Sequence, residues 1–251
     1  MIETIEHGEI RELHLARPPV NALNPGLVRQ LREAIAAARD DDVRGLVVSG
    51  TAGMFSAGLD VPFLLGIDRD AMRDFWGDFF GLCSDLACSP IPVAAALTGH
   101  CPAGGTVLAI MCDYRVMARG SFRIGLNEVQ VGLSVPDCIQ FAMRRLVGAY
   151  RAERLMVSGA LVDADHACAI GLVDELTDTD QVVAHTRAWL EQLLQLPPNA
   201  MRETRRMARA DLANVFADPN ALPVDGFLQG WFSPESQATL AALVAKLKDR
   251  K

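Results

Sequence analysis

The sequence lacks the signatures of several common protein classes. It has no Cys-x-x-Cys pair, and several of its six cysteines lie in apolar runs, so we interpret them as reduced residues of the core. Neither the Gly-x-Gly-x-x-Gly pattern of dinucleotide-binding folds nor a Walker phosphate-binding motif occurs. Proline or charge interrupts every apolar stretch well before it could cross a membrane. We therefore do not expect a disulfide scaffold, a nucleotide-binding fold of these kinds or a membrane-spanning protein.

The sequence also has no excess of positive charge, and we do not expect a leader sequence at its start. The chain has 24 Lys and Arg against 31 Asp and Glu, which gives a formal net charge of −7 and argues against sequence-independent binding to nucleic acid or anionic membrane. Residues 1–6 contain no basic stretch and no apolar segment of the kind that a secretory or organellar signal requires. We expect a cytoplasmic protein that binds neither nucleic acid nor membrane.

The composition and the order of extended and helical patterns indicate a packed α/β protein. Half of the 251 residues are hydrophobic and 22% are charged, which excludes disorder, collagen and a coiled-coil rod. A chain of this length can bury one sizeable core without disulfides or metal ions. The N-terminal half alternates short extended runs with longer helical patterns, and from residue 150 onward the pattern is almost entirely helical. A core of strands followed by a helical C-terminal region fits this pattern best.

The expected elements can be located by their apolar spacing. Strands are predicted where short runs alternate or are apolar on both faces, at residues 10–15, 45–49, 91–97 and 114–118. A helix is predicted after Asn24 and Pro25, with an apolar face formed by Leu27, Leu31, Ile35 and Ala38. A last helix is predicted after Ser233, with Leu240, Leu243, Val244 and Leu247 on one face.

Two glycine-rich loops follow predicted strands, where α/β proteins commonly place their chemistry. Residues 55–60 read FSAGLD, and small side chains there allow a backbone N–H group to approach a ligand. Residues 99–105 read GHCPAGG and precede a helical pattern, so exposed amides at a helix N-terminus could bind an oxyanion. Each loop by itself could equally be a tight strand-to-helix turn.

A single carboxylate, Glu128, lies inside the apolar segment 124–133, which reads IGLNEVQVGL. Burial raises the pKa of a carboxyl group because it disfavours the charged form, and this would suit Glu128 to act as a general base. Taken alone, a lone glutamate of this kind is more often a salt-bridged structural residue. The segment gains a functional interpretation when it is taken together with the two loops.

Four motifs in order make the sequence resemble one family. They are residues 17–24 (RPPVNALN), residues 55–60, residues 102–105 followed by CDYR at 112–115, and the segment around Glu128. In this order they resemble the crotonase superfamily, the enoyl-CoA hydratase/isomerase group, over nearly the whole chain. The resemblance implies an α/β, ClpP-like spiral of ββα units over residues 1–195. It also implies a helical C-terminal region over residues 196–251 that drives assembly into a homotrimer or hexamer.

The resemblance also implies a binding site for an acyl-CoA thioester. The family shares an oxyanion hole of two backbone N–H groups, which motif matching assigns here to Leu59 and Gly104. The adenine end of the substrate would lie against the backbone of Ser56 and Ala57, and Arg17 is a weaker candidate for a nucleotide contact. No metal, nicotinamide or flavin is implied, because coenzyme A is part of the substrate.

The nature of residue 107 separates two activities within the family. Hydratases resemble one another in using two glutamates to activate water, and the first of these positions is occupied here by Val107, which cannot orient water. The closer resemblance is to the Δ3,Δ2-enoyl-CoA isomerases of fatty-acid β-oxidation, and Pro136 also falls in their register. The implied catalytic residues are Glu128, which moves a proton from C2 to C4, and the amides of Leu59 and Gly104, which hold the dienolate.

Other enolate-forming activities, a hydratase, and a non-catalytic acyl-CoA-binding or RNA-binding member remain alternatives. Asp137 lies close to a position where other members carry an acid, but we expect it to cap the helix over residues 138–146. His100 is expected to be a structural, hydrogen-bonded residue. Arginines at helical spacing are expected on a solvated face, with CoA phosphate or subunit contact as the alternative: Arg202, Arg205, Arg206 and Arg209. Lys246 and Lys248 are open to the same two interpretations.

Overall fold

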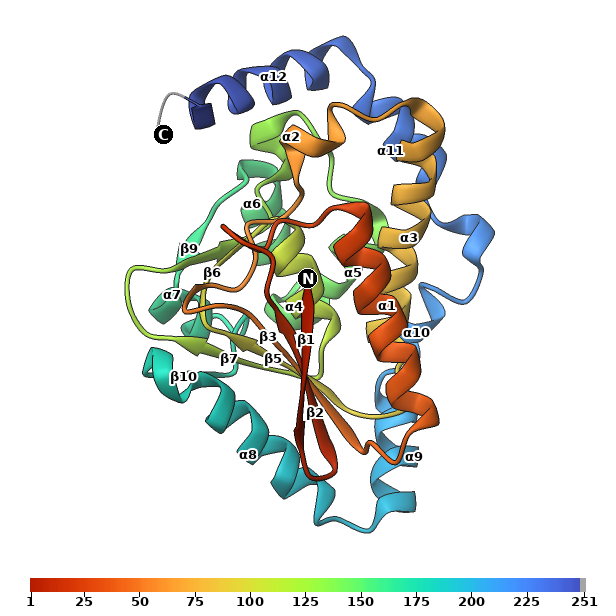
Figure 1. Cartoon of the computed structure of the whole chain (residues 1–251), viewed down its shortest axis with the longest axis vertical. Coiled ribbons are helices and arrows are strands. Elements are labelled where there is room, and N and C mark those ends of the chain that lie inside the picture. Colours follow the sequence, from red (N-terminus) through yellow and green to blue (C-terminus); the bar gives the residue numbers. More distant parts are fainter. Residues whose placement is uncertain (249–251) are drawn as a thin grey trace.

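The computed structural model of the protein describes residues 1–248, without the side chains of residues 39 and 40. It contains a six-stranded sheet in the order β1-β2-β3-β5-β7-β10 and a four-stranded sheet in the order β4-β6-β8-β9 (Figure 1). The larger sheet comprises β1 (Ile2–His7), β2 (Ile10–Leu15), β3 (Gly45–Ser49), β5 (Val93–Leu97), β7 (Tyr114–Ala118) and β10 (Glu175–Thr177). The smaller one comprises β4 (Gly53–Met54), β6 (Gly99–Pro102), β8 (Arg123–Gly125) and β9 (Val162–Asp163).

Helices connect and cover the strands. Those within the first two thirds of the chain are α1 (Pro25–Asp40), α2 (Val61–Leu64), α3 (Arg69–Ala87), α4 (Gly104–Met111), the 3₁₀ turn η1 (Glu128–Val131), α5 (Asp137–Val147), α6 (Ala149–Ser158) and α7 (Ala164–Ala169). The remainder are η2 (Thr179–Gln181), α8 (Val182–Leu194), α9 (Pro198–Ala208), α10 (Ala210–Asn214), η3 (Pro219–Ala221), α11 (Val224–Trp231) and α12 (Pro234–Lys248).

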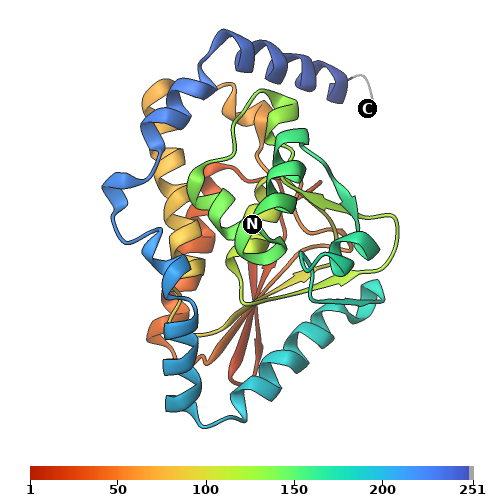
Figure 2. The ribbon, with the colours of Figure 1, turned by 180° about the vertical axis from the view of Figure 1, so that it is seen from behind.

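The central strands β3 and β5 of the larger sheet are buried on both faces, as is usual in a mainly parallel sheet, whereas the edge strand β1 is largely exposed. Only the β1–β2 pair within it is antiparallel. One face packs against α8, and the other faces the main core formed with α1, α3 and α4. Figures 1 and 2 show α8 on one side of this sheet and the α1–α3 pair on the other. The completely buried pattern of β3 and β5 follows from this sandwiching.

Most of the elements predicted from apolar spacing are confirmed. The Asn24 side chain caps α1 by accepting a hydrogen bond of 2.8 Å from the Leu27 amide. The predicted apolar face of this helix is fully buried at Leu27, Leu31, Ile35 and Ala38. The strand expected over residues 91–97 begins later, at Val93, because the Ser89 hydroxyl and the Ile91 carbonyl close a turn before it.

Short strands were not predicted. The glycine-rich loop at residues 99–105 begins with β6, which pairs in parallel with β4 and β8. The part of the chain after residue 150, expected to be almost entirely helical, contains β9 and β10. These strands have two to four residues each, so they are too short to show an alternating pattern and form only because a neighbouring strand offers its backbone.

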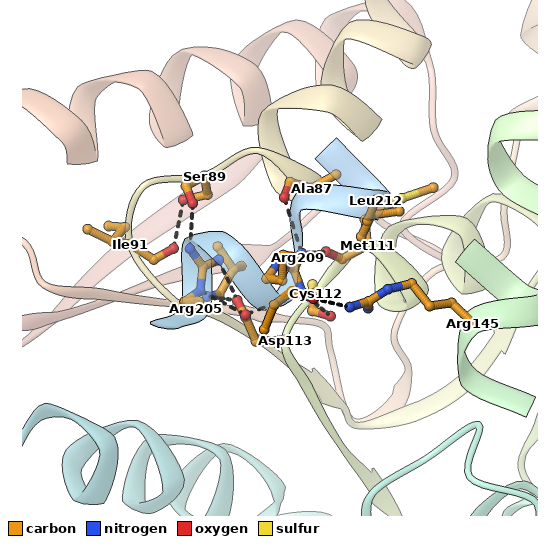
Figure 3. Close-up of polar contacts among 12 residues, drawn as sticks. Ala87, Ser89, Ile91, Met111, Cys112, Asp113, Arg145, Arg205, Arg209 and Leu212 are labelled. Carbon is orange, nitrogen blue, oxygen red and sulfur yellow. Dashed lines mark hydrogen bonds and ion pairs between the residues drawn. The ribbon is translucent and has the colours of Figure 1, made fainter. Parts of the chain in front are cut away.

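The expectation of a solvated arginine face is wrong for Arg205 and Arg209 of the C-terminal region (Figure 3). Arg205 donates two hydrogen bonds of 2.8 Å to the Asp113 carboxylate and one of 2.6 Å to the Ser89 carbonyl. Arg209 is buried; it donates to the carbonyl of Met111 at 2.7 Å and lies 3.2 Å from Asp113. The two arginines therefore fasten the C-terminal helices to the strand-bearing core, while Arg202 and Arg206 are exposed.

Asp113→Ala should destabilise the fold strongly. Without this carboxylate, the buried Arg209 and the half-buried Arg205 lose the acidic partner that they share among the described residues, and breaking a buried pair in this way typically costs about 3–5 kcal/mol. Urea unfolding followed by circular dichroism measures the loss. The matched control is Glu203→Ala, which removes an ion pair with Arg206 on the exposed side of the same helix and should change stability little. Equal losses in the two variants would contradict the assigned anchoring role.

Several other expectations concern the chain as a whole. Among residues 1–248 no helix is long and apolar enough to cross a membrane. All six cysteines are free thiols; four are buried, whereas Cys168 is half-buried and Cys88 is exposed, so the core interpretation is wrong for Cys88. The division of the chain at residue 195 stays a prediction, and residues 249–251 of the predicted C-terminal region lie outside the described residues.

Candidate active site

Three parallel strands of the smaller sheet end beside one another, and each leads into one of the segments predicted to be functional. β4 pairs with β6, and β6 pairs with β8, in parallel. β4 runs into residues 55–60, β6 runs into the start of α4, and β8 runs into residues 126–128. The carboxyl ends of parallel strands meet at one edge of a sheet, so segments far apart in the sequence come together there.

Gly58 and Gly104 bring the first two segments into contact. A Cβ atom at Gly58 would lie 3.1 Å from the Gly104 nitrogen and 3.0 Å from the Ala103 Cβ atom. Gly58 also has a φ angle of +84°, in the left-handed region that favours glycine. Only glycine fits at position 58 without separating the two segments, and their backbones are therefore held side by side.

The amides of Leu59 and Gly104 are available as donors. Within residues 1–248 neither N–H group donates a hydrogen bond to a protein acceptor. Their neighbours are engaged: the Asp60 amide donates to the Leu23 carbonyl at 2.9 Å, and the Ala103 amide donates to the Gly125 carbonyl at 2.8 Å. Two unused donors on touching loops, one of them at the N-terminus of α4, form an arrangement that can stabilise a negatively charged oxygen.

Glu128 is the third residue after β8 and is buried, with 8% of its surface exposed. Burial raises the pKa of its carboxyl group to about 7, and a hydrogen bond from its own backbone amide opposes this shift. Its Oε2 atom and the Oδ1 atom of Asn127 are buried without hydrogen-bond partners. Among the described residues Glu128 forms no ion pair, so the salt-bridged structural interpretation is wrong. A lone carboxyl group with a pKa near neutrality can both accept and return a proton.

Hydrogen bonds tie the segment before Glu128 to the helix that begins with Gly104. The Gly125 amide donates to the Thr106 hydroxyl at 2.9 Å, and this hydroxyl donates in turn to the Cys101 carbonyl. Val107 is the next residue of α4 and is buried, with 1% of its surface exposed. The helix therefore presents no second carboxylate at this position.

Residues 6–239 match the family model described as enoyl-CoA hydratase/isomerase. The chain belongs to this family. It is 29% identical over 254 residues to "Enoyl-CoA delta isomerase 1, mitochondrial" of Mus musculus, a match that spans 100% of this chain and 88% of that protein. It is 34% identical over 217 residues to "Probable enoyl-CoA hydratase echA17" of Mycobacterium avium (strain 104), which covers 83% of this chain and 80% of the relative.

A solved structure agrees with this family over the whole chain. The crystal structure of human mitochondrial delta3-delta2-enoyl-CoA isomerase superposes with a TM-score of 0.93 at 27% identity, covering 100% of this chain and 99% of that one. The predicted crotonase fold is confirmed. As a member of the enoyl-CoA hydratase/isomerase family, the protein is expected to act on an acyl-CoA substrate.

The first motif, residues 17–24, supports the loop at residues 55–60 from outside. The Leu23 amide donates to the Gly58 carbonyl at 2.7 Å, and the Arg17 guanidinium donates to the Asp60 carboxylate at 2.5 Å. Asn21 is buried, has a φ angle of +51°, and donates to the Phe55 carbonyl at 3.1 Å. The positioning roles of Asn21 and Asp60 were not predicted. The motif indicated that residues 17–24 belong to the functional region. It could not indicate these contacts, because they join residues far apart in the sequence.

Ser56 and Ala57, predicted to contact the substrate, use some of their polar groups inside the protein. The buried Ser56 hydroxyl donates to the Asn21 carbonyl at 2.8 Å and accepts from the Gly58 amide at 3.2 Å. The Ala57 amide donates to the Val20 carbonyl at 3.0 Å. These bonds shape the loop, so a substrate contact at either residue stays a prediction.

Three other polar candidates are Asp137, Lys246 and His100, the last of which belongs to β6. Asp137 is exposed in the first turn of α5, but Pro136 occupies the cap position and no side chain caps the helix, so the predicted capping role is wrong. The His100 ring accepts a hydrogen bond of 3.2 Å from the Arg123 amide and packs edge-on against Phe122, as expected for a structural residue. Lys246 is exposed in the last turn of α12. Within the described residues no cluster of three or more His, Cys, Asp or Glu could hold a metal ion.

Proposed function

We propose that the protein is a Δ3,Δ2-enoyl-CoA isomerase that shifts a double bond of an unsaturated fatty acyl-CoA. The observation that carries this proposal is the buried carboxyl group of Glu128, whose pKa is raised to about 7, in a segment that is hydrogen-bonded to α4, a helix with Val107 and no second carboxylate. A single carboxyl group that is half protonated near pH 7 suits proton transfer between two carbons of one substrate.

In the proposed mechanism Glu128 removes a proton from C2 of a 3-enoyl-CoA. The electron pair of the broken C–H bond moves into the C2–thioester carbon bond, and the carbonyl oxygen becomes an enolate oxygen that accepts hydrogen bonds from the amides of Leu59 and Gly104. Protonated Glu128 then delivers its proton to C4, and the double bond forms between C2 and C3. Atoms and charge balance within the enzyme–substrate pair, because the carboxylate is regenerated.

Coenzyme A enters as part of the substrate in this proposal, and no separate cofactor takes part. The backbone of Ser56 and Ala57 is proposed to lie near its adenine end. We further propose that the protein acts in the cytoplasm as a homotrimer or hexamer. Light scattering after size-exclusion chromatography measures the oligomeric state.

Hydratase activity is the second candidate, favoured by the 34% identity to the mycobacterial relative named as a probable enoyl-CoA hydratase. Hydration needs a water molecule held for attack at C3, and the buried isopropyl group of Val107 offers it no hydrogen bond. The two candidate activities also differ in their substrates: an isomerase consumes a 3-enoyl-CoA, and a hydratase consumes a 2-enoyl-CoA.

Parallel assays separate these candidates. A 3-enoyl-CoA is supplied and the absorbance of the conjugated 2-enoyl thioester is followed as it forms; a 2-enoyl-CoA is supplied separately and its loss by water addition is followed. We expect formation of the conjugated product and no hydration. Rapid loss of the 2-enoyl-CoA would support a hydratase, and inactivity on both substrates with retained acyl-CoA binding would reject both activities.

The pH dependence of kcat/KM should show the titration of Glu128. The base must be deprotonated before it can attack C2, so kcat/KM should rise with pH through about 7 and level off above it, because burial holds the pKa of this carboxyl group there. Initial rates at saturating and limiting substrate between pH 5 and pH 9 measure the profile, and circular dichroism at each pH checks folding. A rate already maximal at pH 5 would show that the reacting group is not this carboxyl group.

A further inference from the structure

Glu128 is carried by a short turn that has little support of its own. Its carboxylate receives no hydrogen bond from any other described residue. The turn η1 has four residues, and its end is closed by a weak hydrogen bond of 3.3 Å from the Gly132 amide to the Val129 carbonyl and one of 3.1 Å from the Leu133 amide to the Glu128 carbonyl. The position of the carboxylate therefore depends on what holds this turn.

The helix α12, from the other end of the chain, holds one side of the turn. The Ser236 hydroxyl is buried and donates a hydrogen bond of 2.5 Å to the Gly132 carbonyl. A Cβ atom at Gly132 would lie 3.1 Å from the Ser236 Cα atom, and Gly132 has a φ angle of +77°, so the helix backbone sits directly on the turn. Figure 1 shows α12 lying across the end of the molecule where α2 is found, and it contacts η1, α2 and α11.

Ser236 is held in place by the start of its own helix. The Ser233 hydroxyl donates to the Ser236 hydroxyl at 2.9 Å and accepts from the Ser236 amide at 3.2 Å. The Ser236 hydroxyl thus accepts from Ser233 and keeps its own proton for the Gly132 carbonyl, which can only accept.

The C-terminal end of α6 holds the turn at a second place. The Gln130 side chain donates a hydrogen bond of 2.8 Å to the Gly159 carbonyl. Gly159 ends α6 in a left-handed conformation, and a Cβ atom there would lie 2.8 Å from Val129 and 2.9 Å from Gln130. The turn η1 therefore contacts both α6 and α12.

We propose that Ser236 and Gln130 are positioning residues for the catalytic base: they clamp η1 between α12 and α6 and thereby hold Glu128 buried at the reaction site. This inference rests on the proposed function, because it assigns the clamp to the reaction that Glu128 carries out. Neither side chain has to touch the substrate, since each acts through the backbone of the turn.

Direct titration of Glu128 tests the clamp. The protein is labelled with ¹³C at the glutamate carboxyl carbons, the Glu128 signal is assigned by its absence in Glu128→Gln, and its midpoint is followed by NMR in Ser236→Ala and Gln130→Met. Loosening the turn admits water, which favours the charged carboxylate. We expect the midpoint to move from about 7 toward the ordinary value of 4.5 in both variants. The kcat for isomerisation should fall about 10- to 100-fold with little change in KM.

Ser158→Ala is the matched control. Its hydroxyl lies near the end of α6 but donates to the Arg154 carbonyl within that helix, at 2.7 Å, so the variant should titrate and react as the wild type does. Wild-type midpoints in Ser236→Ala and Gln130→Met would overturn the inference; because Gln130 is exposed, that variant decides the matter even if Ser236→Ala fails to fold. Midpoints that shift as expected in an enzyme that does not isomerise would keep the clamp and reject only the proposed reaction.

Discussion

Glu128→Gln is expected to lower kcat for isomerisation by about 10²–10⁴-fold, the usual contribution of a positioned general base. The amide is nearly isosteric with the carboxylic acid, so it can occupy the same buried site, but it cannot accept the C2 proton. Binding of the acyl-CoA should change much less than kcat, because we assign recognition of the thioester to the amides of Leu59 and Gly104. Initial rates with a 3-enoyl-CoA measure the first effect, and calorimetric titration with a saturated acyl-CoA measures the second.

The control for this substitution is Asp137→Asn, which neutralises a nearby carboxylate in the same stretch of sequence. Asp137 is exposed at the start of α5, so its loss should leave kcat close to the wild-type value. If Asp137→Asn were the inactive variant and Glu128→Gln the active one, the assignment of the base would be reversed. If both variants stayed active, proton transfer would have to be carried out by another group, such as His100.

Gly58→Ala is expected to lower kcat by about 10²–10³-fold, comparable to the loss of one oxyanion donor. The added Cβ atom would lie 3.0 Å from the Ala103 Cβ atom and 3.1 Å from the Gly104 nitrogen, so the two loops must move apart. The amides of Leu59 and Gly104 could then no longer converge on one oxygen atom. Rates with a 3-enoyl-CoA, together with a check of folding by circular dichroism, measure this effect.

Gly53→Ala separates this steric effect from backbone strain. Gly53 has the same φ angle of +84° as Gly58, but a Cβ atom there would meet nothing within 4 Å. It therefore carries the strain of a left-handed alanine without pushing on the second loop, and its kcat should stay near that of the wild type. Equal losses in Gly53→Ala and Gly58→Ala would mean that the effect comes from strain, and the convergence of the two amides would lose its support.

The Arg205–Asp113 anchor and the Ser236–Gly132 contact show the C-terminal helices in two different roles. The first pair attaches helices to the core through buried charge, with distances of 2.8 Å between guanidinium nitrogens and carboxylate oxygens. The second touches the turn that carries Glu128. Loss of Asp113 should therefore appear mainly in unfolding, and loss of the Ser236 hydroxyl mainly in the titration of Glu128.

The sequence by itself determined the features that depend on local spacing. The buried face of α1 could be predicted because apolar residues recur at helical intervals, and the Asn24 cap because asparagine favours that position. The apolar surroundings of Glu128 likewise predicted a raised pKa, and burial is the cause of the shift in the folded protein. The order of four loose motifs was sufficient for the family, since it required no knowledge of contacts.

Only the tertiary structure decided which distant residues meet. The strand β6 lies inside a glycine-rich loop and forms because β4 and β8 pair with it on either side. Its four residues are too few to show a pattern from which a strand could be predicted. Arg209 has the same helical spacing as the exposed Arg202, yet it is buried, because the core carbonyl of Met111 happens to face it. The grip of Ser236 on Gly132 joins residues far apart in the chain. Such contacts depend on how whole elements pack, and this information is absent from the local periodicity that a sequence displays.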